Sequence, residues 1–140
     1  MTGLPKRAVV LAAGLGTRLR PLTFERPKPL LPLWNVPLLE RVLRLLEGWG
    51  VEEIAVNLHW QPEKLRAFLA RRGGAARIQT SYEPEILGTG GALRPLRDFA
   101  GEAPFWVMNA DIAAELDPAP LLRAFAAGDG LAAAWLEPKK

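Results

Sequence analysis

Short apolar runs alternate along the chain with amphipathic stretches, and this alternation limits the possible folds more than any other feature of the sequence. Runs typical of buried strands occupy residues 7–13, 54–58, 76–80 and 105–109. Stretches with helical spacing lie between them, over residues 36–50, 62–71 and 88–99. Strands that alternate with helices favour an α/β domain with a mostly parallel sheet, because each helix carries the chain back to the same end of the sheet.

Two further elements are predicted near the end of the sequence. Asp117-Pro118 can open a helix that runs to about residue 127, and residues 131–136 form an apolar run typical of a fifth strand. Within the predicted helix 88–99, Pro95 lacks an N–H and disfavours helical geometry at Arg94.

A chain of 140 residues with 49% hydrophobic content suits one core, so residues 1–140 are predicted to form a single domain.

Composition excludes several classes of function. The chain has no Cys, which rules out disulfides, thiolate zinc sites and cysteine nucleophiles and is consistent with a reducing cytoplasm. A net charge of only +3, with Arg71-Arg72 predicted as a solvated helix end, gives no basic face for nucleic acid. No apolar run approaches a membrane span, and no signal-peptide segment precedes the first strand. A soluble, cytoplasmic protein is therefore expected.

A glycine turn follows the first predicted strand, in the sequence Leu11-Ala-Ala-Gly14-Leu-Gly16-Thr17-Arg18-Leu-Arg20-Pro21. Gly14 and Gly16 allow the backbone to turn tightly and to bring N–H groups close to an anion. The turn is not a dinucleotide fingerprint, since Leu19 stands where the third glycine would be, and it lacks the Gly-Lys-Ser/Thr end of a Walker loop. On the two glycines alone, a plain turn is as good an interpretation as a phosphate site.

Two cations near this turn strengthen the phosphate interpretation. Arg18 can hold two phosphate oxygens in a fork, while Lys28 offers a compact point charge. Pro27 and Pro29 stiffen the backbone on either side of Lys28 and so restrict its reach.

In an open α/β sheet, ligands bind beyond the carboxyl ends of the strands. The glycine turn, Gly88 to Gly91 and Asp111 all follow predicted strands, so we expect them to meet in one crevice.

The segment from Leu11 to Glu40 resembles the opening of the sugar-phosphate nucleotidyltransferases. The L-A-A-G-x-G-T-R-L-x-P-L-T stretch, the P-K-x-L-x-P stretch and the P-hydrophobic-hydrophobic-E helix start of that family are all present. Gly88-Thr-Gly90-Gly91-Ala92 and Asn109-Ala110-Asp111 match later segments, with Ala110 where glycine is usual. The resemblance implies a Rossmann-like three-layer α/β/α fold. It implies an enzyme that transfers a nucleoside monophosphate from a nucleoside triphosphate to a sugar 1-phosphate, giving a nucleotide sugar and pyrophosphate.

The resemblance also assigns roles to individual residues. Arg18 and Lys28 would be catalytic cations, and Asp111 would hold Mg²⁺, although without the family match an N-cap or turn aspartate is the simpler interpretation. Asn57 would face the sugar phosphate, Glu83 or Glu85 would accept a hydrogen bond, and the lone His59 is left without a role. Nucleotide contacts are implied for Leu11, Ala13, Gly14, Gly16, Thr17, Gly88 and Gly91.

Family members continue well beyond this length, so the resemblance implies that a sugar-binding part and a second metal-binding aspartate lie outside these residues. The alternative is a non-catalytic nucleotide-binding or regulatory homologue of the same fold. A dehydrogenase domain ranks last, because Asn57 and Leu58 stand where a ribose-binding carboxylate would be. The base, the sugar and the oligomeric state, including a homo-oligomer, are left open by the sequence.

Overall fold

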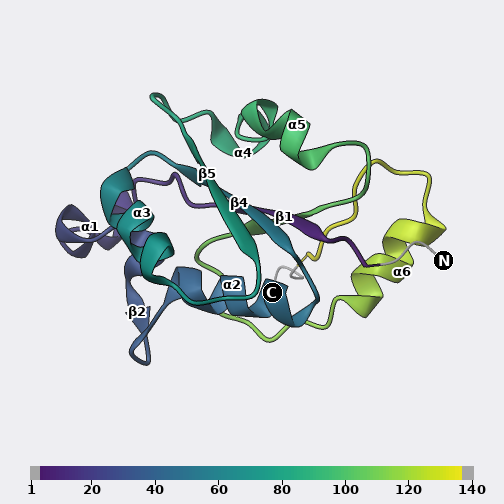
Figure 1. Ribbon diagram of the computed structural model, residues 1–140, viewed down its shortest axis with the longest axis horizontal. Helices are drawn as coiled ribbons and strands as arrows, with labels where there is room; N and C mark the ends of the chain where they lie inside the picture. Colours follow the sequence, from purple (N-terminus) through teal and green to yellow (C-terminus); the bar gives the residue numbers. More distant parts are fainter. Residues whose placement is uncertain (1–3, 137–140) are drawn as a thin grey trace.

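The computed structural model of the protein, shown in Figure 1, describes residues 4–136. Its centre is a four-stranded, all-parallel sheet with the strand order β5-β4-β1-β6. The strands are Arg7–Leu11 (β1), Glu53–Leu58 (β4), Arg77–Tyr82 (β5) and Trp106–Asn109 (β6). In register, Leu11 lies between Asn57 on β4 and Asn109 on β6, so the carboxyl ends of three strands are level.

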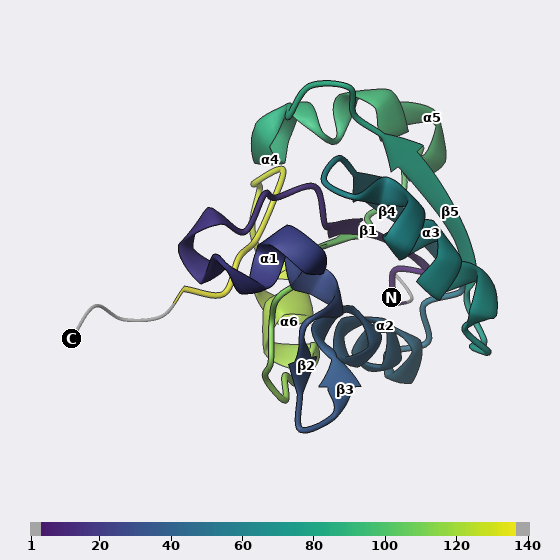
Figure 2. The same cartoon turned by 90° about the vertical axis from the view of Figure 1, so that its left-hand side faces the viewer.

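Helices cover both faces of this sheet. One face carries Leu38–Gly48 (α2), Pro62–Arg71 (α3) and Ala119–Ala127 (α6), and the other carries Gly88–Gly91 (α4) and Arg97–Ala100 (α5). Figure 2 shows the three layers, with α4 and α5 above the sheet and α2 and α6 below it. Ala8 and Val10 point to the larger core on the α2 side, while Val9 points to the smaller core on the other side. The predicted α/β/α fold is confirmed.

The spacing of apolar residues explains why α2 lies where it does. Leu39, Leu43 and Leu46 recur at intervals of three and four, and all are fully buried against the sheet. Trp49, immediately after the helix, closes the same core and donates its indole N–H to the Leu116 carbonyl at 3.2 Å. The predicted helix began too early, because residues Val36–Pro37 form a short strand (β3) instead.

That short strand belongs to a hairpin. It pairs antiparallel with Pro32–Leu33 (β2), and Trp34 and Asn35 in the turn both have positive φ angles, of 48° and 60°. A short helix, Leu22–Glu25 (α1), precedes it, flanked by the 3₁₀ turns Thr17–Leu19 and Lys28–Leu30. In Figure 2 these elements lie on the side of the molecule that faces the viewer.

Two sequence-based predictions need correction. The helix predicted over 88–99 is broken into α4, a 3₁₀ turn at Arg94–Leu96 and α5, because Pro95 interrupts the helical hydrogen bonds. Residues 131–136 form no strand. Their apolar composition is not matched by a hydrogen-bonding neighbour, and Leu131 is fully exposed. Within this segment, Trp135 contacts the rings of Trp49 and Trp106 at centroid distances of 5.9 and 6.4 Å.

The Arg71-Arg72 pair also differs from its prediction as a solvated helix end. Arg71 is exposed, but the Arg72 side chain is only 4% exposed. Its guanidinium donates to both Glu47 carboxylate oxygens at 2.8 and 2.6 Å, and to Glu40 at 2.7 Å. Arg72 therefore joins the end of α3 to α2. Among residues 4–136, no helix is long and apolar enough to cross a membrane.

Candidate functional site

A cleft of about 380 Å³ lies at the carboxyl ends of the parallel strands. Segments that are far apart in the sequence form its walls: the turn after β1, the loop around Lys28, the start of α4 and the end of β6. All but one of the predicted site residues line it, namely Leu11, Ala13, Gly14, Gly16, Thr17, Arg18, Lys28, Gly88 and Asp111. The expected crevice therefore exists, and the roles of these residues in it stay predictions.

Gly16 fixes the shape of the first wall. Its φ is +64°, and a Cβ at this position would lie 2.8 Å from the Thr23 methyl group and 3.1 Å from Cβ of Lys28. The Thr23 hydroxyl donates to the Gly16 carbonyl at 2.8 Å, and the Thr23 carbonyl accepts from the Trp60 indole at 2.9 Å. Thr23 is buried and was not singled out from the sequence, where a lone threonine gives no signal. The turn is thus held from behind, which leaves its other side to the cleft.

Two other glycines of the cleft, Gly14 and Gly88, differ from Gly16 in having open space beside them. A Cβ on Gly14 or on Gly88 would meet no protein atom within 4 Å, so the space beside each is open. Both residues line the cleft, which leaves room for a ligand to lie against the backbone. Gly91 differs, because it does not line the cleft and a Cβ there would lie 2.9 Å from Cβ of Leu87. The space around Gly91 is therefore filled by its own loop.

The cationic and acidic residues of the cleft lie close together. Lys28 lies between the buried Pro27 and Pro29, and its ammonium forms an ion pair with Asp111. Asp111 is placed by the end of β6, where the Ala110 amide donates to the Leu11 carbonyl at 3.0 Å and continues the sheet ladder. The two side chains are 29% and 38% exposed, so both can still be reached from the cleft.

Arg18 has a different environment from Lys28. It lies on the exposed 3₁₀ turn Thr17–Leu19 at the edge of the cleft. Within residues 4–136 it forms no ion pair with a carboxylate. Its guanidinium therefore adds uncompensated positive charge to the wall that the glycine turn forms, as an anion site requires.

The floor of the cleft holds two buried polar side chains, Asn57 and Glu83. The Asn57 amide donates to one Glu83 oxygen at 2.7 Å, and its own oxygen accepts from the Ala12 N–H at 2.6 Å. Both polar atoms of Asn57 therefore make hydrogen bonds within the protein, and its role towards a sugar phosphate stays a prediction. His59, left without a role by the sequence, hydrogen-bonds through Nδ1 to the Glu83 carbonyl at 2.8 Å. For the pair of Asn57 and Glu83, the signal in the sequence is an asparagine within the otherwise apolar run 54–58.

Asp111 offers the chemistry that a magnesium ion requires. Carboxylate oxygen is a preferred ligand, and Mg²⁺ is commonly held by one or two carboxylates together with waters and substrate phosphates. Its carboxylate already holds a cation, the Lys28 ammonium, so the position favours positive charge. Among the described residues there is no group of three acidic, His or Cys side chains that could hold a metal ion by themselves. The site therefore fits an ion that arrives with phosphate ligands of its own.

The fold and the cleft together define a class of protein. An all-parallel sheet with helices on both faces, and a glycine turn, two cations and a carboxylate at its carboxyl edge, has the layout of α/β proteins that bind phosphorylated ligands at this edge. A model of the nucleotidyl transferase family matches residues 7–139. The chain belongs to this family.

Individual relatives agree with this assignment. The chain is 40% identical over 139 residues to N-acetylmuramate alpha-1-phosphate uridylyltransferase of Caulobacter vibrioides, covering 96% of this chain and 55% of that protein. It is 39% identical over 115 residues to mannose-1-phosphate guanylyltransferase 1 of Arabidopsis thaliana, covering 78% of this chain and 32% of that protein. The chain thus spans about half or less of the length of these relatives.

Solved structures show the same fold. The crystal structure of HddC from Yersinia pseudotuberculosis in complex with GMP-PN matches with a TM-score of 0.76 and 30% sequence identity. The match covers 89% of this chain and 56% of that one. The predicted resemblance is therefore confirmed at the level of family and fold.

Proposed function

We propose that the chain carries the nucleotide-binding half of a sugar-phosphate nucleotidyltransferase site. The reaction transfers a nucleoside monophosphate from a nucleoside triphosphate to a sugar 1-phosphate. One observation carries the proposal: the turn at Gly14 to Arg18, Lys28 and Asp111 come from three distant segments and line one cleft. Backbone N–H groups, two cations and a carboxylate suit a triphosphate better than they suit an uncharged ligand.

The proposed chemistry needs no protein nucleophile. An oxygen of the sugar 1-phosphate attacks the α-phosphorus, the bond from that phosphorus to the oxygen bridging to the β-phosphate breaks, and pyrophosphate leaves with the bonding electrons. The turn and Arg18 bind and orient the triphosphate, and Lys28 stabilises the charge that develops on the phosphoryl oxygens. Asp111 would hold Mg²⁺, which when bound neutralises phosphate charge. The open space beside Gly88 would admit the nucleoside.

The test is pyrophosphate release by the 140-residue chain with Mg²⁺, using GTP, UTP, dTTP and CTP in turn with mannose 1-phosphate and N-acetylmuramate 1-phosphate. Release with one nucleotide, abolished in Asp111→Asn, is the expected result. Asp129→Asn is the matched control, because Asp129 is an exposed aspartate outside the cleft. No release and no nucleotide binding would overturn the proposal.

A second function has one observation in its favour. The chain covers 55% and 32% of the two curated relatives described above, so a large part of each has no counterpart among these residues. A chain of this kind could bind a nucleotide without turning it over and act by association. Calorimetric binding of GTP or UTP without pyrophosphate release would identify this alternative.

A further inference from the structure

The pair Asn57 and Glu83 is buried more deeply than any other polar group of the cleft, with exposures of 3% and 1%. No ion pair among residues 4–136 includes Glu83, so its carboxylate is buried without a cation. Burying such a group is costly unless hydrogen bonds satisfy it. An apolar pair would fill the same volume without that cost, so a stabilising role alone does not explain the arrangement.

The hydrogen bonds of this pair form one continuous chain across the floor of the cleft. The Ala12 N–H donates to Asn57 Oδ1 at 2.6 Å, and Asn57 Nδ2 donates to Glu83 Oε1 at 2.7 Å. The other Glu83 oxygen, Oε2, accepts from the Leu87 N–H at 3.1 Å. Ala12 lies two residues before Gly14, and Leu87 directly precedes Gly88. This chain of hydrogen bonds therefore joins the two glycine segments that form walls of the cleft.

We propose that Asn57 and Glu83 are positioning residues that hold these two walls in register for the nucleotide. The inference rests on the proposed function, because it assigns the phosphate side of the ligand to one wall and the nucleoside side to the other. Asn57 and Glu83 donate and accept hydrogen bonds between themselves and with the backbone amides of Ala12 and Leu87. They act by fixing the backbone at Ala12 and Leu87 in advance, so that binding does not have to order the walls.

The direction of the hydrogen bonds makes this proposal sharply testable. The run of hydrogen bonds begins and ends at a backbone donor, the Ala12 amide and the Leu87 amide. Each side chain must therefore present an acceptor to its backbone amide, and the two side chains must form one donor–acceptor pair between them. Asn57→Asp places two carboxylates face to face. Glu83→Gln leaves two donors facing each other at one of the contacts. The double variant N57D/E83Q reverses the middle bond, satisfies both backbone donors and keeps the same total charge. All three variants keep the shape of the side chains.

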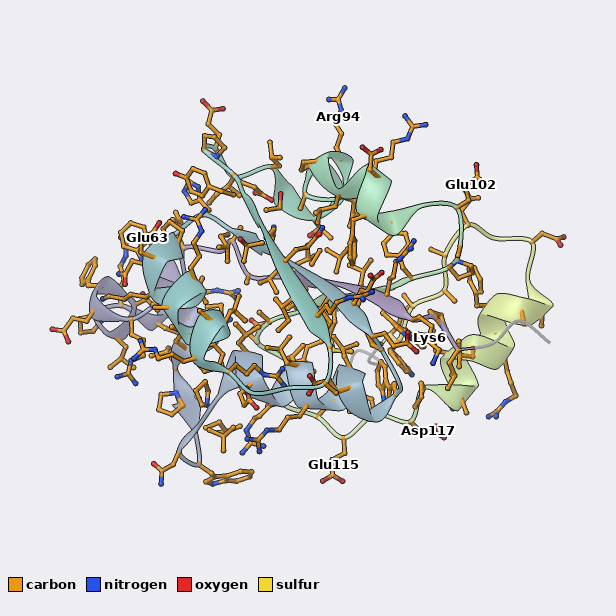
Figure 3. All side chains as sticks on the ribbon, in the orientation of Figure 1. Lys6, Glu63, Arg94, Glu102, Glu115 and Asp117 are labelled. Atoms are coloured by element: carbon orange, nitrogen blue, oxygen red, sulfur yellow. The ribbon has the colours of Figure 1, made fainter. Side chains whose placement is uncertain are left out.

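The first measurement is calorimetric affinity of the 140-residue chain for GTP and for UTP, each with Mg²⁺. We expect each single variant to bind at least about tenfold more weakly, the effect of one unsatisfied buried polar group, and the double variant to return to within about threefold of the wild type. Asn35→Asp in the exposed hairpin turn and Glu102→Gln, which projects outward in Figure 3, are isosteric controls and should bind like the wild type. A double variant as weak as the weaker single variant would overturn the proposal, even if a single variant fails to fold.

The second measurement is amide hydrogen exchange without nucleotide. Asn57 makes no hydrogen bond to the Leu87 amide, so faster exchange at Leu87 in Asn57→Asp, restored in the double variant, would report coupling through Glu83. Unchanged exchange at Leu87 would contradict the inference whatever the chain binds. A wild type that binds none of GTP, UTP, dTTP and CTP would defeat the proposed function alone, whereas single variants that bind as tightly as the wild type would defeat only this inference.

Discussion

Lys28 and Asp111 lie 83 residues apart in the sequence and form an ion pair within the cleft. One comes from a proline-flanked loop and the other from the end of the edge strand β6. The carboxylate proposed to hold Mg²⁺ thus pairs with a cation of the protein itself. If Asp111 holds a metal ion as proposed, we expect the ammonium and the ion to compete for this carboxylate, so that binding of a metal–nucleotide complex releases Lys28 towards the phosphates.

Removing the competing ammonium should strengthen metal binding in the absence of nucleotide. We expect Lys28→Ala to raise the affinity for Mn²⁺, used as a spectroscopic substitute for Mg²⁺, by about two- to fivefold, since a partly exposed ion pair contributes up to about 1 kcal/mol. Electron paramagnetic resonance of free Mn²⁺ measures this directly. Lys6→Ala is the control, because Lys6 lies at the amino end of β1, as Figure 3 shows, and pairs with Glu52 on the surface. Equal or weaker Mn²⁺ binding by Lys28→Ala would contradict the competition.

The same substitution should have the opposite effect on catalysis. We expect Lys28→Ala to lower the rate of pyrophosphate release by roughly two to three orders of magnitude, as for loss of a cation that stabilises the transition state. Initial rates at saturating nucleotide measure it, with Lys6→Ala again as the control. A turnover rate equal to that of the wild type would show that Lys28 is not a catalytic residue.

The two glycines of the first turn should respond differently to alanine. Gly16→Ala should destabilise the fold by at least about 1–2 kcal/mol, because φ is +64° and the new Cβ would meet the Thr23 methyl group at 2.8 Å. Gly14→Ala should leave stability within about 0.5 kcal/mol, since its Cβ would meet no protein atom, but it should weaken nucleotide binding. Urea denaturation and calorimetry separate the two effects. Equal loss of stability in both variants would contradict this division.

The sequence predicted the layers and the site because both follow from local patterns. Apolar runs and helical spacing identified the elements, and helix 62–71 agrees with α3 to the residue. The rule that ligands bind at the carboxyl edge predicted that the glycine turn, the Gly88 segment and Asp111 meet in one crevice, and Gly14, Gly88 and Asp111 do line one cleft. These are properties of backbone geometry and topology, which a sequence pattern carries directly.

Features that depend on side-chain partners could not be predicted in the same way. Nothing near Arg72 in the sequence shows that Glu40 and Glu47 approach it from another helix. The pairing of Asn57 with Glu83 likewise joins β4 to the residue that directly follows β5. Residues 131–136 show the same limit for secondary structure, because a strand needs a neighbour that apolar composition does not supply.

The buried guanidinium of Arg72 should be a large contributor to stability. Arg72→Ala leaves Glu47 and Glu40 without their shared partner, and breaking a buried pair of this kind costs about 3 kcal/mol. The neighbouring Arg71→Ala is the matched control, since Arg71 is exposed and donates to the Ala67 carbonyl of its own helix. Urea denaturation at pH 7 measures both. Similar free energies of unfolding for the two variants would show that the cluster is not a structural link.

The same cluster should make the protein sensitive to acid. The hydrogen bonds from Arg72 hold the pKa of Glu47 below its ordinary value of 4.5, against the opposing effect of burial. A carboxyl whose pKa is lowered by folding contributes its full stabilisation at pH values above its pKa in the unfolded state. This stabilisation is lost as the pH falls through its pKa in the folded state. The free energy of unfolding should therefore decline as pH falls below about 4.5.

Other carboxyls act in the same pH range, so the contribution of Glu47 must be isolated by comparison. The hydrogen bonds from Arg7 and Arg77 lower the pKa of Glu53 as well, and both arginines remain in Arg72→Ala. The stability difference between the wild type and Arg72→Ala should therefore shrink as the pH falls from 7 to about 3, because protonation of Glu47 removes the negative charge that Arg72 stabilises. Urea midpoints for both proteins across this range give the difference. A difference that stays constant as pH falls would mean that the Arg72 contribution does not depend on the charge of Glu47.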